Sequence, residues 1–157
     1  MKKYIGVKEI KAKPMKRGEY NSYRGWDIPA DENPDDEGFI VEYIDGGKAN
    51  HPAHAGYISW SPAGVFERAY RRVDGLTFGQ AIEAMKAGKK VARAGWNGKG
   101  MWLGLVQDTW AINFDVDGDI QKYENHPYIV MKTVENKIVP WLASQTDMLS
   151  EDWMVVE

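Results

Sequence analysis

The apolar positions between Thr77 and Gly88 recur at the spacing of an amphipathic helix. They are Phe78, Ala81, Ile82 and Met85. Thr77 followed by Gln80 is a capping-box pattern, in which each side chain satisfies an exposed backbone N–H group of the first turn. Gly88 readily adopts the left-handed conformation that ends helices. The pattern therefore predicts a helix that begins at about Phe78 and ends before Gly88.

The rest of the second half of the chain is mainly extended, with β-branched and aromatic residues between turn residues. Strands are predicted over residues 89–93, 102–106, 110–116, 128–133, 137–142 and 153–156. Residues 115–119 are expected to form a turn, and Glu135 and Asn136 the tip of a hairpin. Asp147 is expected to cap one helical turn that reaches Ser150. This half is therefore predicted to be α+β, with one main helix on a small, mostly antiparallel sheet.

The first half of the chain predicts a smaller α+β unit. Strands are expected over residues 4–13, 39–44 and 57–60, and a short helix over residues 15–24. The acidic, proline-bearing segment 27–38 is expected to be a solvated loop. Ser61 and Pro62 predict a helix start with proline at the first helical position, and the helix is expected to reach Arg71. Residues 73–75 are typical of a linker between two units. We therefore expect an N-terminal accessory unit over 1–74 and a second unit over 75–157.

Aromatic side chains are frequent in the first unit. They are Tyr20, Tyr23, Trp26, Tyr43, Tyr57, Trp60 and Tyr70. Aromatic residues bury large areas and dominate the packing of small domains. We therefore expect these side chains to form a small core rather than a binding face.

Composition narrows the possible classes of protein. The 157 residues are 43% hydrophobic, which is enough for a packed core, and no run of apolar residues has the length of about 18 that a membrane span needs. The N-terminus, MKKYIGVKEIKAK, has no apolar signal-peptide segment. The net charge of −3 argues against a general binder of long nucleic acids, and the lack of cysteine excludes disulfides and thiolate metal sites. We expect a cytoplasmic protein.

Two patterns invite a metal-binding interpretation, and neither fits. Asp115, Asp117 and Asp119 alternate as in a calcium loop, but the glycine comes one position early and His126 stands where the ligating glutamate should be. His51 and His54 are three residues apart, but the proline between them argues against a helix and no third ligand is near in sequence. We expect an ordinary Asp-Gly turn, solvated histidines and no metal.

A glycine-punctuated loop follows the predicted helix and strand, and two further blocks complete a family pattern. The blocks are TFGQAIEAMKAGKKVARAGWNGKGMW at 77–102, PYIVMKT at 127–133 and VPWLASQTDMLSEDWMVV at 139–156. In this order they resemble the phage-encoded family known as the second Thoeris anti-defence proteins. The resemblance covers about residues 75–157.

That resemblance implies a function and an assembly. The family is described as a homotetrameric sponge that sequesters a cyclic ADP-ribose immune signal without cleaving it. The expectation for this chain is therefore a non-catalytic nucleotide-binding protein that evades host immunity in the bacterial cytoplasm. Its expected partners are a cyclic ADP-ribose isomer and further copies of itself, and no cofactor is expected.

Candidate ligand-binding residues lie within the three blocks. They are Arg93, Trp96, Asn97, Trp102, Trp141, Ser144, Gln145, Thr146 and Asp147. Aromatic faces suit the base, acceptor oxygens suit the ribose hydroxyls, and hydroxyl, amide or backbone donors suit the phosphate oxygens. Arg93, Lys89 or Lys99 could add a charge-assisted contact to the diphosphate.

Two other functions stay open. A hydrolase would need a nucleophile, a base and an orienting group, for which Ser144, His126 and Asp147 are available without any motif that places them together. A protein-interaction module with a host or virion partner is suggested by the N-terminal unit, because a nucleotide sponge has no evident need of it.

Overall fold

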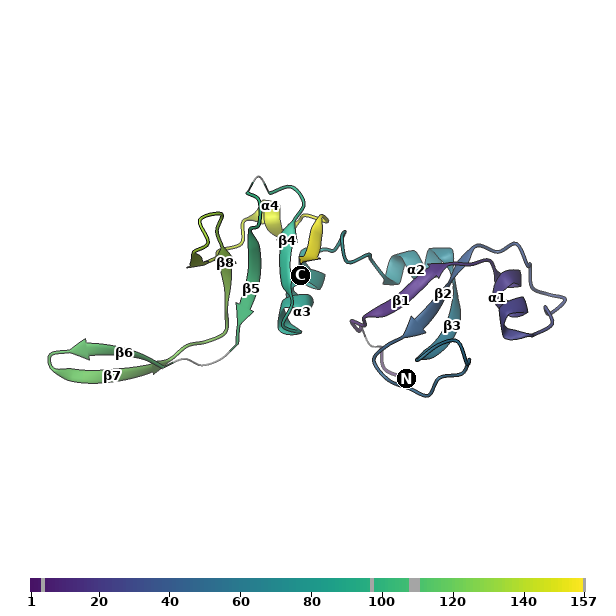
Figure 1. The fold of residues 1–157 in the computed structure, drawn as a ribbon, viewed down its shortest axis with the longest axis horizontal. Helices are drawn as coiled ribbons and strands as arrows, with labels where there is room; N and C mark the ends of the chain where they lie inside the picture. The colour runs from purple at the N-terminus through teal and green to yellow at the C-terminus, as the bar shows by residue number, and fades with distance from the viewer. Residues whose placement is uncertain (4, 97, 108–110, 157) are drawn as a thin grey trace. The chain divides into compact units, whose positions relative to one another are not determined.

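The computed structural model describes residues 1–3, 5–96, 98–107 and 111–156, which form two compact units (Figure 1). The N-terminal unit is Met1–Arg71 and the C-terminal unit is Arg72–Glu157. Both units combine helices with antiparallel strand pairs, so the predicted α+β class is confirmed.

The N-terminal unit contains a three-stranded antiparallel sheet of order β1-β2-β3. Its elements are β1 (Ile10–Pro14), α1 (Arg17–Arg24), β2 (Gly38–Tyr43), β3 (Tyr57–Pro62) and α2 (Ala63–Ala69). Tyr20 from α1 packs with Ile40 and Ile58 of the sheet in a small buried cluster. The segment between α1 and β2 is a loop, as the sequence predicts.

Two expected boundaries in this unit are wrong. The strand expected over residues 4–13 begins only at Ile10, because pairing with β2 starts there; residue 4 lies outside the described part of the chain. Pro62 is not the first helical residue. It pairs with Gly38 as the last residue of β3 and keeps an extended backbone, and α2 starts one residue later and ends at Ala69.

The C-terminal unit contains a five-stranded antiparallel sheet of order β10-β4-β5-β8-β9 and a separate two-stranded sheet, β6-β7. Its elements are α3 (Phe78–Lys86), β4 (Lys90–Arg93), β5 (Trp102–Val106), β6 (Ala111–Val116), β7 (Asp119–Glu124), β8 (Tyr128–Lys132), β9 (Ile138–Pro140), α4 (Gln145–Met148) and β10 (Trp153–Val156). α3 packs on β4, β5 and β10. The last strand of the chain therefore lies beside β4, where its first residue, Trp153, pairs with Arg93.

Local signals placed α3 correctly. The Thr77 hydroxyl accepts from the Gln80 N–H at 3.4 Å, the Gln80 amide oxygen accepts from the Thr77 N–H at 3.0 Å, and the helix begins at Phe78. Gly88 has a φ of 80°, and its N–H donates to the Met85 carbonyl at 2.9 Å. The capping box and the glycine thus set both ends of the helix.

Two expectations in the C-terminal unit are corrected. Strand β7 was not predicted. Asp117 and Gly118 both have positive φ and make a two-residue hairpin turn, so the chain returns at once to pair with β6. The residue that caps α4 is Ser144 and not Asp147, because the Ser144 hydroxyl accepts from the Asp147 N–H. Trp110, where a strand was expected to start, lies outside the described residues.

Trp153 is the centre of the C-terminal core. It has no solvent exposure and packs with buried residues of α3, β4 and β5. Its indole N–H donates to the Asp147 carbonyl at 3.0 Å, which ties α4 to the core. The predicted ligand-binding segment 144–147 is therefore anchored by a fully buried side chain.

Candidate functional site

Arg93 connects the end of β4 with α4 and with the turn before β10. Its Nη1 atom lies 2.8 Å from the Asp147 Oδ1 atom, and its Nε atom lies 2.8 Å from the Asp152 Oδ1 atom. Asp152 also accepts from the Gly95 N–H at 2.9 Å. One guanidinium thus holds two carboxylates that come from different segments.

Asp147 collects further donors. The Ser144 hydroxyl donates to its Oδ2 atom at 2.6 Å, and the Trp96 indole N–H donates to its Oδ1 atom at 3.4 Å. The structure therefore brings Arg93, Trp96, Ser144 and Asp147 into one hydrogen-bonded group, which we call the Asp147 cluster. Four of the nine predicted ligand-binding residues belong to it.

The aromatic rings of this region form a layer around Trp153. The Trp96 ring meets Trp153 edge-on at a centroid distance of 5.5 Å, and Trp141 meets it edge-on at 6.1 Å. Phe78 contacts both Trp141 and Trp153. Trp141 and Trp96 are therefore half-buried partners of the core as well as candidates for ligand contact.

The charges of the Asp147 cluster stabilise one another. Burial acts to raise the pKa of Asp147, but the hydrogen bonds from Ser144, Arg93 and Trp96 outweigh it and lower that pKa. The hydrogen bonds from Arg93 are the main cause that lowers the pKa of Asp152. Both carboxylates are thus held ionised opposite Arg93, and this cation is balanced within the unit.

The polar side chains at the start of α4 face solvent. Ser144, Gln145 and Thr146 are exposed, and the side chains of Gln145 and Thr146 make no hydrogen bond to the part of the chain that the structure describes. Leu142 and Leu149, on either side of this segment, are 92% and 81% exposed. The segment 142–149 therefore presents free polar groups between two uncovered leucines.

Trp102 lies away from this cluster. Leu103 faces the core under α3, and successive strand residues point to opposite faces, so Trp102 lies on the other face of the sheet. There the Lys90 ammonium lies 5.3 Å from the centre of its ring. Asn97 lies outside the described residues. Of the two additional cations, Lys89 is half-buried and Lys99 is exposed.

The geometry around Ser144 is that of a helix cap. Its hydroxyl donates directly to Asp147 and accepts from the Asp147 N–H at 3.1 Å, so no base stands between serine and carboxylate. Where the structure describes side chains, no three His, Asp or Glu residues gather in a metal-binding arrangement.

The histidines of the β2–β3 loop are packed, contrary to the expectation that they are simply solvated. The His51 ring stacks on Tyr23 at a centroid distance of 4.4 Å. His54 lies between the Glu42 carboxylate at 3.1 Å and the Tyr23 hydroxyl at 3.0 Å. They attach the loop to α1.

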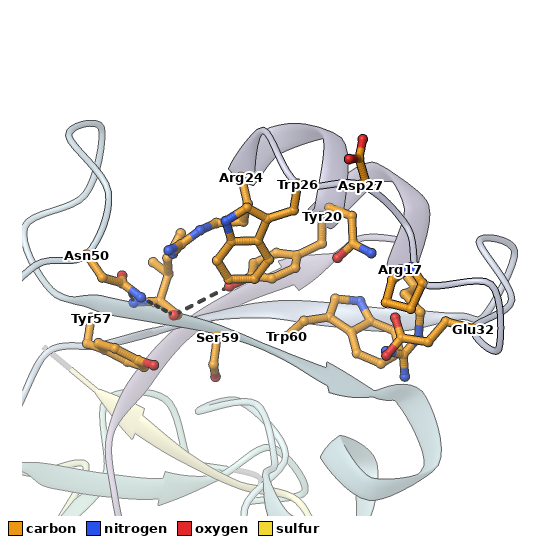
Figure 2. Close-up of a pocket in the computed structure, with 13 residues that line it drawn as sticks. Arg17, Tyr20, Arg24, Trp26, Asp27, Glu32, Asn50, Tyr57, Ser59 and Trp60 are labelled. Atoms are coloured by element: carbon orange, nitrogen blue, oxygen red, sulfur yellow. Dashed lines mark hydrogen bonds and ion pairs between the residues drawn. The ribbon is translucent and has the colours of Figure 1, made fainter.

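A pocket of about 800 Å³ lies in the N-terminal unit, between α1, the loop after it and β3 (Figure 2). It is lined by Arg17, Tyr20, Asn21, Arg24, Trp26, Asp27, Pro29, Glu32, Asn50, Tyr57, Ile58, Ser59 and Trp60. The expected aromatic core is therefore only partly formed. Tyr20 is buried, but Trp26 and Tyr57 are 53% and 47% exposed at the pocket.

Sequence reasoning missed two charged residues. Asp152 pairs with Arg93 of the Asp147 cluster, and the antiparallel pairing of β10 with β4, which sets Trp153 opposite Arg93, is the signal that could have found it. Arg24 lines the pocket. Its place at the end of a short helix, two residues before Trp26, could have marked a cation beside an aromatic ring.

Comparison with known proteins concerns the C-terminal unit. The model of the Thoeris anti-defense 2-like domain matches residues 76–156. The chain is also similar to the protein Thoeris anti-defense 2 of Bacillus phage SP01. The two are 44% identical over 85 residues, which are 52% of this chain and 94% of that relative. Among the described residues, no helix is long and apolar enough to cross a membrane.

Proposed function

The chain belongs to the Thoeris anti-defense 2-like family. We propose that it blocks the Thoeris defence by binding a cyclic ADP-ribose signal without cleaving it. The proposed site of action is the cytoplasm of the infected bacterium. The observation that carries the proposal is the family match over the same residues that hold the Asp147 cluster and the exposed start of α4.

The proposed ligand contacts divide into two groups. Arg93 and Asp147 are occupied by each other, so their role is to hold the start of α4 in place. Ser144, Gln145 and Thr146 are exposed, and the polar side chains of the last two are available to accept from ribose hydroxyls or donate to phosphate oxygens. Trp96 donates to Asp147, and Trp96 and Trp141 are both half-buried against Trp153, so the exposed parts of their rings are the aromatic surface proposed for the base.

A second copy of the chain would complete such a site. Leu142 and Leu149 expose apolar side chains on both sides of residues 144–146, and a second subunit packed over this segment would remove them from water. We propose that subunits meet over this segment and enclose the nucleotide between them, in the tetramer that the family resemblance implies. The ligand would then contact groups from more than one subunit.

Sequestration requires tight binding but no bond cleavage. A dissociation constant near 1 nM corresponds to about −12 kcal/mol, which a rigid cyclic ligand can reach because it loses little conformational entropy. The protein then lowers the free concentration of the signal by mass action. Enough copies and slow release are its only further requirements.

The test is capture and release. Purified protein is mixed with cyclic ADP-ribose isomers at a known stoichiometry, freed from unbound nucleotide and heated, and the released nucleotide is chromatographed. Recovery of intact cyclic nucleotide is the expected result. Linear fragments would instead favour the hydrolase alternative, and no depletion of any isomer would contradict both.

A Gln145→Ala, Thr146→Ala double variant sharpens this test, because both side chains are exposed and the fold does not depend on them. Lys137→Gln is a matched surface control, since Lys137 is exposed and its ammonium pairs with the exposed Glu135 carboxylate. The double variant should deplete less nucleotide than the control. If a host or virion protein were captured while every nucleotide stayed free, the protein-interaction alternative would replace this proposal.

A further inference from the structure

The pocket of the N-terminal unit lies outside the residues that the family match covers, and its two ends differ. Figure 2 shows Arg17, Trp60 and Glu32 at one end, and Arg24, Trp26 and Tyr20 nearer the other. A ligand can bind only where an aromatic face is exposed or a hydrogen-bond donor lacks an acceptor.

The Arg17 end is already paired with carboxylates. The Arg17 Nε atom makes no hydrogen bond among the described residues, but it lies 3.5 Å from the Asp36 Oδ2 atom. The Arg17 guanidinium lies over the Trp60 ring at 4.3 Å, and its Nη1 atom lies 2.7 Å from the Glu32 carboxylate. The Trp60 indole N–H donates to the Met15 carbonyl at 2.8 Å, and Gly38 lies directly against the ring. Charge and ring surface at this end are therefore used by the protein itself.

The Arg24 end is only partly satisfied, because the guanidinium interacts with the Tyr20 hydroxyl but has no carboxylate partner among the described residues. The Arg24 guanidinium lies over the Trp26 ring at 4.4 Å, and its Nη1 atom is buried with no hydrogen-bond partner among the described residues. A buried guanidinium N–H without an acceptor is costly, and such groups are normally paired. Figure 2 shows the nearby Asp27 carboxylate pointing away from this guanidinium. The site thus offers a donor that lacks its anion.

Open aromatic surface lies beside that donor. Trp26 is 53% exposed and Tyr57 is 47% exposed, and Tyr20 meets Trp26 edge-on at 6.1 Å. Arg24 covers one part of the Trp26 ring and leaves the rest to solvent. A planar ring can therefore stack on Trp26 while an anionic group of the same molecule reaches Arg24.

The adjoining edge of β3 is unsuited to an added peptide strand at this position. The Asn50 side chain accepts from the Ile58 N–H at 2.8 Å and donates to the Ile58 carbonyl at 2.9 Å. It thus occupies the backbone groups that a neighbouring strand would use. This observation favours a small molecule over an extended peptide, and a volume of about 800 Å³ is within the range of small-molecule sites.

We propose that this pocket is a second ligand site, which binds a small molecule that combines a planar ring with an anionic group, the chemistry of a nucleoside phosphate. The ring stacks on Trp26 and the anion accepts from Arg24. The site is independent of the proposed nucleotide capture by the C-terminal unit, because every lining residue lies between Arg17 and Trp60.

The test is calorimetric titration of the full chain with adenosine monophosphate, adenosine and inorganic phosphate. Adenosine monophosphate is expected to bind about tenfold or more tightly than either part alone, because it uses both contacts. Arg24→Gln should weaken its binding about tenfold and leave adenosine unchanged, whereas Trp26→Leu should weaken both. Arg68→Gln, which changes an exposed arginine of the same unit outside the pocket, is the control and should change nothing.

Three results would overturn the proposal. They are no binding of adenosine monophosphate at millimolar concentration, equal affinity for adenosine, and binding that neither pocket variant weakens. Thermal unfolding of each variant checks its fold, and a shift of the Trp26 indole resonance in the unaltered chain provides a test without substitution. Capture of cyclic ADP-ribose by Arg24→Gln should be unchanged, so failure of this site and failure of the proposed function give different results.

Discussion

The two units of the chain each contain a partly buried arginine, and the two arginines have different partners. In the C-terminal unit, Arg93 lies between Asp147 and Asp152, and both carboxylates are held ionised against it. In the N-terminal unit, Arg24 rests on Trp26, and its Nη1 atom has no acceptor in the part of the chain that the structure describes. A cation that is balanced by carboxylates inside the protein fixes geometry, whereas one without a carboxylate partner is available to bind an anion.

The tryptophans of the two units also differ, in how much of each ring is exposed to solvent. Trp153 is fully buried among Phe78, Trp96 and Trp141, and Trp26 is half-exposed at a pocket. Aromatic content alone therefore does not identify a binding face. The accessible ring surface and the state of the neighbouring polar groups do.

The largest expected change in stability comes from substituting Trp153, and Trp26 is the comparison. Trp153→Ala should lower the free energy of unfolding by about 3–5 kcal/mol, because it removes a large buried ring and leaves a cavity. Trp26→Ala should cost about 1 kcal/mol or less, since its ring is half-exposed. Urea denaturation followed by circular dichroism measures both, and equal losses would contradict the contrast between core and pocket.

Arg93→Gln is expected to have the next largest effect. It leaves Asp147 and Asp152 without their shared cation, and we expect a loss of about 1–3 kcal/mol, less than for a fully buried pair because each side chain keeps some solvent contact. Lys137→Gln, which breaks an exposed pair, should stay within about 0.5 kcal/mol. Chemical denaturation of both variants is the measurement, and a similar small loss in each would show that Arg93 does not organise the cluster.

Ser144→Ala tests the cap of α4. The variant removes the acceptor for the Asp147 N–H and a donor to its carboxylate, and about 1 kcal/mol of stability should be lost. Thr146→Ala changes an exposed side chain of the same helix and should be nearly neutral. Thermal unfolding compares the two, and the assignment of Ser144 as the cap fails if Thr146→Ala is the more damaging change.

The pH dependence of stability tests the charges of the cluster. The pKa of Asp152 is lower in the folded chain than in the unfolded chain, so its contribution is present above about pH 4 and is lost as pH falls through the folded pKa. The stability difference between the unaltered chain and Asp152→Asn should therefore be largest at neutral pH and shrink below about pH 4. A difference that stays constant down to pH 2 would contradict this role of Asp152.

The sequence predicts the structure correctly where capping residues and glycines determine the backbone geometry by themselves. Thr77 with Gln80 and Gly88 set the ends of α3 without help from distant residues. The cap of α4 was assigned to the wrong residue because Ser144 and Asp147 are both good capping residues, and only the fold decides between them.

The candidate sites depend on contacts between segments that are distant along the chain, and local sequence patterns do not predict such contacts. Asp152 joins Arg93 only because β10 pairs with β4, 59 residues away along the chain. Trp102 was grouped with Trp96, but strand alternation sends it to the opposite face of the sheet. The pocket beside Arg24 is lined by residues of α1, the loop after it and β3, which are distant in sequence. No local sequence pattern predicts such a pocket.

The most direct test of the proposed function is a calorimetric titration of the full chain and of its Gln145→Ala, Thr146→Ala double variant with cyclic ADP-ribose. Both proteins should have the same unfolding midpoint, because neither side chain contributes a hydrogen bond to the described structure. The proposal predicts tight binding by the unaltered chain and binding about tenfold weaker or more in the variant. Absence of binding by the unaltered chain, or equal affinity in both proteins, would contradict it.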